Sequence, residues 1–141
     1  MRRARSSADL DIVLGPVRSF EWFWASNSEM PGLDAFEALS CKDKAMLIAT
    51  LEHWSELNLG KHVSETRINE EHGKPTILAA KAGKHRFSMF HAGKNLWIVC
   101  RYYEKQKQKL DRNGKRAIEL TIEDRRDYIE RVSAGEYYGR R

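Results

Sequence analysis

The clearest pattern along the chain is a set of three strand-like runs at residues 76–82, 85–91 and 95–103. The links between them, 83–84 and 92–94, have lengths typical of β-hairpins, so we expect an antiparallel meander. Side chains alternate between the two faces of a strand. The second run therefore opposes Arg86, Ser88 and Phe90 to His85, Phe87, Met89 and His91, and the third opposes Trp97, Val99, Arg101 and Tyr103 to Leu96, Ile98, Cys100 and Tyr102. An arginine on each of two neighbouring strands can line one surface.

The first half of the chain predicts one strand followed by two helices. The aromatic run at 19–25 fits a strand, and a short helix at 33–39 leads into a longer one that Ser40 caps, with Asp43 in its first turn. Apolar residues at helical spacing predict that this second helix packs on a sheet, and Gly60 is placed to end it. These residues are Met46, Leu47, Leu51, Trp54 and Leu57.

A closing helix is predicted at 115–132, with an apolar stripe of Ile118, Ile122, Ile129 and Val132. Residues 61–75 show no period and are expected to form a loop. The length of 141 residues suits one hydrophobic core, so we expect a single α+β domain over 1–141. Its ends, 1–15 and 134–141, are expected to be flexible tails.

Charge divides the chain into two unlike parts. Residues 1–80 carry 9 basic and 12 acidic side chains, whereas residues 81–141 carry 16 basic and 8 acidic ones. A positive C-terminal half of this kind suits a polyanion such as RNA or DNA. A solvated basic surface without a partner is the alternative interpretation.

The cysteine count, the lack of a membrane-spanning run and the spacing of the histidines indicate the compartment and the cofactors to expect. Cys41 and Cys100 are too few for a disulfide framework, which favours a reducing compartment. The sequence has no apolar run near the roughly 20 residues of a membrane span, and its arginine-rich start leads into acidic residues, so we expect a cytoplasmic protein without a membrane partner. His62 and His72 lack metal-ligand spacing, and we expect neither a metal nor a small-molecule cofactor.

Two motifs in the second half point to a known family. The first is Lys84-His85-Arg86-Phe87 at the start of the second meander strand, and the second is the segment Tyr103-Glu104-Lys105-Gln106-Lys107-Gln108-Lys109 before the closing helix. Together with the element order they resemble the RelE/ParE superfamily of bacterial toxins, in its HigB-like and phage-derived branch. The second segment is similar to that family's aromatic-x-Lys-Lys-x-Gln-Lys pattern, except that Gln106 replaces the second lysine and Leu110-Asp111 stands where a proline often follows.

The closing helix is also similar, with Ile118-Glu119 near its start and Arg125, Arg126, Asp127 and Tyr128 further on. The motif resemblance covers about a third of the chain, and the element order covers most of it apart from the first 20 residues. It implies a RelE-like domain in which a small antiparallel sheet packs against N-terminal helices and a C-terminal helix.

The resemblance implies a toxin of a type II toxin-antitoxin system that cleaves mRNA on the ribosome through the RNA 2′-hydroxyl, without a metal. Its partners would be mRNA, the ribosome and a cognate antitoxin protein. By position, Arg86 is the candidate for stabilising the phosphate, and His85, Arg101 and Lys105 are candidates for positioning or proton transfer. The candidate RNA-binding residues are Lys81, Lys84, His91, Tyr103, Lys107, Lys109, Tyr137 and Tyr138.

Each of these roles has a structural alternative. Arg86 and Arg101 can pair with a carboxylate across the sheet, residues 105–109 can form a solvated turn, and His91 is interpreted chiefly as a sheet histidine. Tyr137 and Tyr138 can stack on a base only where the tail folds over the site. A gyrase inhibitor of the ParE type and a non-catalytic nucleic-acid-binding module remain the two alternative functions.

Overall fold

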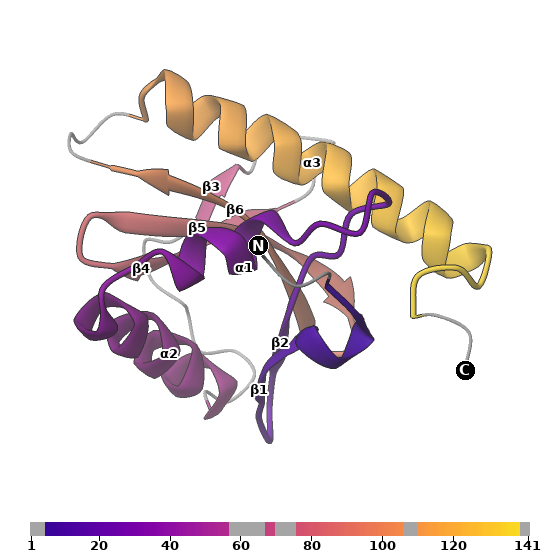
Figure 1. Ribbon diagram of the computed structural model, residues 1–141, viewed down its shortest axis with the longest axis horizontal. Helices are drawn as coiled ribbons and strands as arrows, with labels where there is room; N and C mark the ends of the chain where they lie inside the picture. Colours follow the sequence, from indigo (N-terminus) through magenta and orange to yellow (C-terminus); the bar gives the residue numbers. More distant parts are fainter. Residues whose placement is uncertain (1–4, 57–66, 70–75, 106–109, 139–141) are drawn as a thin grey trace.

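One mixed sheet with helices on both faces forms the molecule (Figure 1). The computed structural model describes residues 5–56, 67–69, 76–105 and 110–138. The six strands lie in the order β1-β2-β6-β5-β4-β3. The expected α+β class is confirmed, with elements η1 (Ser7–Asp9), β1 (Asp11–Leu14), β2 (Ser19–Trp22), α1 (Pro31–Glu37), α2 (Cys41–Glu56), β3 (Arg67–Asn69), β4 (Ile77–Ala82), β5 (His85–Gly93), β6 (Leu96–Glu104) and α3 (Arg112–Ser133).

The predicted meander is present as β4, β5 and β6. Its first turn pairs Ala82 with His85, and Gly83 there has a φ of +63°, which glycine adopts without strain. In β5 and β6 the predicted alternation of faces holds from the pair His85–Glu104 to the pair Ser88–Arg101. It fails between Ser88 and Met89, where β6 carries one extra residue, so that Val99 and Cys100 are both buried.

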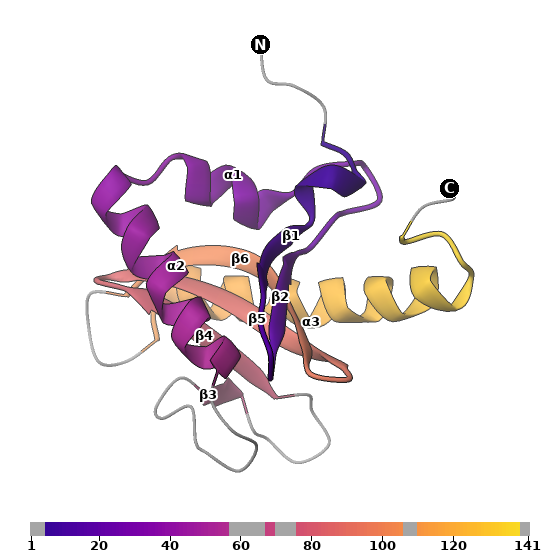
Figure 2. The ribbon, with the colours of Figure 1, turned by 90° about the horizontal axis from the view of Figure 1, so that it is seen from below.

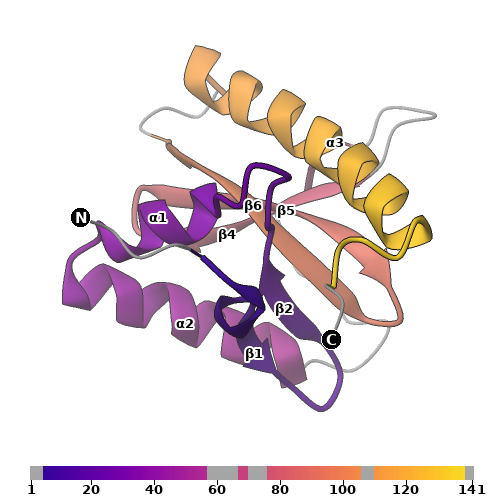
Figure 3. The same cartoon turned by 45° about the vertical axis from the view of Figure 1, so that its right-hand side comes forward.

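The expectation of an antiparallel sheet is wrong at β2, which runs parallel to β6 (Figure 3). Short links impose antiparallel pairing, whereas β2 is joined to the meander through two helices. A connection of that length allows neighbouring strands to run in the same direction. The sheet is therefore mixed, with β6 in its interior between β2 and β5.

Helices cover the sheet from both sides, α1 and α2 on one face and α3 on the other (Figures 1 and 2). As expected, Ser40 caps α2, its Oγ accepting a hydrogen bond from the Asp43 N–H at 3.1 Å. Leu47, Leu51 and Trp54 are buried beneath α2, but Met46 is 38% exposed. Leu57 and Gly60 lie outside the described residues.

Residues 5–14 pack against the rest of the molecule, contrary to the flexible tail expected over 1–15. Ser6 and Asp9 form a capping box around η1, and β1 extends the sheet beside β2. The Arg5 guanidinium lies 2.6 Å from Asp34 and 2.7 Å from Glu37, which ties this segment to α1. Strand formation at β3 also corrects the loop expected over 61–75, because Arg67 and Asn69 pair with β4.

The end of α3 and the segment after it differ from expectation as well. Ile118 is buried, but Ile129 and Val132 are 45% and 40% exposed because the C-terminal end of α3 extends past the sheet (Figure 1). Residues 134–138 are not a free tail, since Tyr137 is fully buried and its hydroxyl accepts a hydrogen bond from the Trp24 N–H at 2.8 Å. Within the described ranges, none of the helices has the length and apolarity needed to cross a membrane.

Candidate functional site

Basic side chains gather at the end of the meander where β4 turns into β5 and β6 ends. Antiparallel pairing sets Lys81 beside Arg86, and the Lys105 N–H donates to the Lys84 carbonyl oxygen at 2.8 Å. We call Lys81, Lys84, Arg86 and Lys105 the basic corner. The structure thus brings together four of the residues that the sequence analysis selected for RNA.

Arg86 keeps its charge available within this corner. Its Nη1 donates to the carbonyl oxygens of Gly83 at 2.6 Å and of His85 at 3.1 Å, so the side chain folds over the turn. These acceptors are neutral, and no carboxylate within the described ranges forms an ion pair with the guanidinium. Tyr103, which pairs with Arg86 across the strands, has its pKa raised to about 12, chiefly by burial and against the opposing effect of Arg86.

A row of hydrogen-bonded side chains leads into the corner from α2. The His85 Nε2 lies 3.1 Å from the Asp43 Oδ2, and its Nδ1 lies 2.6 Å from the Tyr102 hydroxyl. That hydroxyl donates to the Glu104 Oε2 at 3.2 Å, and the other Glu104 oxygen lies 3.6 Å from the Lys84 ammonium. We call Asp43, His85, Tyr102 and Glu104 the polar row.

Both ring nitrogens of His85 take part in the polar row, Nε2 towards Asp43 and Nδ1 towards Tyr102, whose hydroxyl in turn donates to Glu104. An imidazole nitrogen can donate or accept, so the ring links a carboxylate to a phenol hydroxyl. Burial raises the Tyr102 pKa to about 12, so its hydroxyl remains a donor at neutral pH. The arrangement fixes the orientation of an imidazole whose side chain is 12% exposed.

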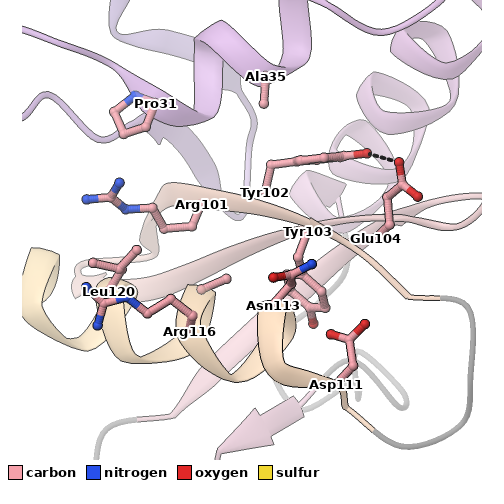
Figure 4. A pocket seen from close by; sticks show the side chains of 11 residues that line it. Pro31, Ala35, Arg101, Tyr102, Tyr103, Glu104, Asp111, Asn113, Arg116 and Leu120 are labelled. Atoms are coloured by element: carbon pink, nitrogen blue, oxygen red, sulfur yellow. Dashed lines mark hydrogen bonds between the residues drawn. The ribbon is translucent and has the colours of Figure 1, made fainter.

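Two hollows open on either side of Tyr102. The first, of about 580 Å³, borders the polar row and is lined by Ala35, Ala38, Leu39, Ser40, Asp43, Lys84, His85, Tyr102 and Glu104. The second, of about 600 Å³, lies between α1 and α3 (Figure 4) and is lined by Pro31, Ala35, Arg101, Tyr102, Tyr103, Glu104, Asp111, Asn113, Arg116, Ala117 and Leu120. We call the second one the α1–α3 groove. Ala35, Tyr102 and Glu104 belong to both hollows, which makes them adjacent.

Arg101 is occupied by a carboxylate from α3. Its Nε and Nη2 donate to the two Asp124 oxygens at 2.8 and 2.9 Å, in a bidentate pair. Burial raises the Asp124 pKa although Arg101 opposes that shift. The pairing agrees with the structural alternative for Arg101, with the carboxylate supplied by the helix.

Several candidates lie away from the basic corner. His91 stands at the other end of β5, where its ring stacks on Trp97 with 4.9 Å between centroids, and burial lowers its pKa. The base-stacking role for Tyr137 is wrong because its ring is fully buried, and Tyr138 donates to Glu21 at 3.0 Å beside β2. Lys107 and Lys109 lie outside the described residues.

The sequence analysis missed Asp43, Tyr102 and Glu104 as members of the site. The β5–β6 hairpin, which turns at residues 94–95 between Gly93 and Leu96, sets His85 opposite Glu104 and Phe87 opposite Tyr102, so its register contained a signal for two of them. Asp43 had no comparable signal because nothing local in the sequence encodes where α2 docks.

Metal ligands do not gather in the described part of the chain, where no three His, Cys, Asp or Glu side chains form a group suited to an ion. Comparison with models of protein families gives no match, and comparison with curated proteins gives none either.

Proposed function

We propose that this chain is a toxin of the RelE/HigB type, an endoribonuclease that cleaves mRNA on the ribosome in the cytoplasm without a metal. The observation that carries the proposal is the meeting of the polar row with the basic corner, where His85 directly follows Lys84 and precedes Arg86 at the turn between β4 and β5. The order of β2, α1, α2, the meander and α3 supports it, since the resemblance implies that order. A polyanion is the partner that four clustered cations favour.

RNA can be cut by its own 2′-hydroxyl when a base takes the proton of that hydroxyl, cations stabilise the phosphate, and an acid protonates the leaving oxygen. The 2′-oxygen bonds to phosphorus while the bond from phosphorus to the 5′-oxygen breaks, leaving a 2′,3′-cyclic phosphate and a 5′-hydroxyl. Arg86 and Lys84 would bind the phosphate charge as it grows. His85 would act as the acid and give a proton to the leaving 5′-oxygen. Lys105 of the basic corner would act as the base and accept the proton released by the 2′-hydroxyl.

A toxin of this type implies a cognate antitoxin protein. An acidic or apolar segment of that partner would cover the basic corner or a sheet edge and so block access of RNA. The partner would be recognised by rescue of growth upon coexpression.

The test is induction of the chain in a bacterial host, with growth and the 5′ ends of abundant mRNAs followed together. We expect growth arrest with new cuts inside translated regions, and loss of both in Arg86→Ala and His85→Gln. Arg126→Ala, an exposed arginine of α3 outside both hollows, serves as the charge-matched control. Arrest without new mRNA ends would instead indicate a ParE-type action on gyrase, and harmless induction would indicate a binding module.

A further inference from the structure

The α1–α3 groove has the composition of a base-binding site. Figure 4 shows Pro31 and Ala35 of α1 facing Asn113, Arg116 and Leu120 of α3, with Tyr102 and Tyr103 of β6 between them. The apolar side chains and the half-buried Tyr102 ring offer surfaces on which an aromatic ring can stack, whereas the Tyr103 ring is only 3% exposed and is not available for stacking. The side chains of Asn113 and Arg116 are exposed and bring hydrogen-bonding groups to the α3 wall.

The charges of the groove suit an uncharged ring better than a phosphate. Asp124 neutralises Arg101 through a bidentate pair, and the Arg116 Nη1 lies 3.4 Å from the Glu119 Oε1 in an exposed pair. Glu104 and Asp111 add two carboxylates to the lining, which disfavour a phosphate in the groove. Phosphates are attracted instead to the basic corner next to it.

Arginine and asparagine each make their bidentate base contacts through the N7 edge of a purine. Arginine pairs with O6 and N7 of guanine, and asparagine pairs with N6 and N7 of adenine. A pyrimidine has no N7 and cannot take either pair. A groove of about 600 Å³ also has room for the two fused rings of a purine.

We propose that the α1–α3 groove binds an unpaired purine base of RNA, with Asn113 and Arg116 reading its N7 edge. The inference rests on the proposed function, because the neighbouring basic corner would hold the phosphates of the same strand. The shared walls at Ala35, Tyr102 and Glu104 connect the groove to the His85 hollow, so the base-binding site adjoins the proposed site of cleavage.

The test is fluorescence anisotropy with oligouridines whose central base is uracil, adenine or guanine and whose sugars are all 2′-O-methylated to prevent cleavage. We expect roughly tenfold tighter binding of the purine-containing strands. Arg116→Ala should remove the gain for guanine and Asn113→Ala the gain for adenine. Lys115→Ala, the neighbouring exposed cation outside the groove, should leave the purine preference unchanged.

The outcomes separate this inference from the proposed function. Equal binding of all three strands, or a purine preference that survives both variants, would overturn the groove as a purine site while RNA binding stands. Failure to bind any strand would overturn both proposals. A free nucleotide is the other source of the same base, so adenosine monophosphate is added as a competitor in the anisotropy assay. If it displaces the labelled strand as strongly as unlabelled RNA does, RNA is overturned as the occupant of the groove.

Discussion

At the residue scale, the pair of Arg101 and Asp124 decides how α3 is held on the sheet. Asp124 is 8% exposed at its side chain and Arg101 is 24% exposed, so the pair is largely withdrawn from water. Burial is costly for both charges, and the bidentate geometry offsets that cost. Loss of one partner leaves the other charge buried without compensation.

We expect Asp124→Ala to lower the free energy of unfolding by about 3 kcal/mol, because it strands the Arg101 guanidinium. Urea unfolding of the purified chain measures it. Asp127→Ala, on the same helix, removes a more exposed carboxylate that pairs with Arg131 and should cost about 1 kcal/mol or less. A double change to Arg101→Met and Asp124→Leu should recover most of the loss. Equal effects of Asp124→Ala and Asp127→Ala would contradict the argument.

The sequence was sufficient to assign side chains to the two faces of each strand. It was not sufficient to show which helix residues those side chains contact. Alternation correctly put Arg86 and Arg101 on one side of the meander and His85 on the other, and hairpin register fixed their neighbours. It did not reveal that Arg101 is paired with Asp124 or that Asp43 reaches His85, because both contacts depend on how helices dock. The availability of a charge is therefore a tertiary property.

At the element scale, the C-terminal segment is held against β2 through a half-buried carboxyl group, that of Glu21. The Tyr138 hydroxyl donates to Glu21 at 3.0 Å and lies 2.7 Å from the Tyr128 hydroxyl of α3. Burial raises the Glu21 pKa, against the lowering effect of the Tyr138 hydrogen bond. Ionisation of Glu21 therefore requires more free energy in the folded state than in the unfolded chain.

This shift sets the sign of a pH dependence. Below the ordinary value of 4.5 the Glu21 carboxyl is protonated in both states, and its ionisation costs nothing. As the pH rises, the unfolded chain ionises first, so the contribution of Glu21 to stability falls until the folded pKa is passed. Glu21→Gln keeps the acceptor for Tyr138 but cannot ionise. We expect urea unfolding to show that the variant gains stability over the parent protein at pH 7 and loses that gain at acidic pH.

Tyr128→Phe is the matched control for that comparison, since it disturbs the same cluster without removing an ionisable carboxyl. Its difference from the parent protein should stay constant over the acidic range. A Glu21→Gln difference that is equally independent of pH would contradict the linkage.

Elements with a strong period were predictable, and elements made by pairing were not. The meander, α2 and α3 were found because many residues repeat one pattern. β1 and β3 have only 4 and 3 residues and owe their strand conformation to β2 and β4, so local sequence carries little signal for them. The stripe on α3 was misjudged at Ile129 because the period does not show where the sheet beneath a helix ends.

At the scale of the whole molecule, the two unlike halves of the chain meet at one end of the sheet. The acidic half supplies α1 and α2. Asp43 lies on α2, and Pro31 and Ala35 of α1 form one wall of the α1–α3 groove. The basic half supplies the meander and α3, from which the basic corner comes. The positive charge is thus concentrated beside a mixed-charge groove, a division that suits phosphates on one side and bases on the other.

This division predicts how RNA affinity responds to salt. Each phosphate neutralised on a single strand contributes about −0.7 to the slope of log affinity against log salt, so full use of the basic corner gives about −3. Anisotropy titrations at several salt concentrations measure that slope. Lys84→Ala combined with Lys105→Ala should reduce its magnitude by about 1.4 and weaken all strands alike. Asn113→Ala should leave the slope unchanged and alter only the preference among bases. A slope near zero, or one that the double variant leaves intact, would mean that these cations do not contact phosphate.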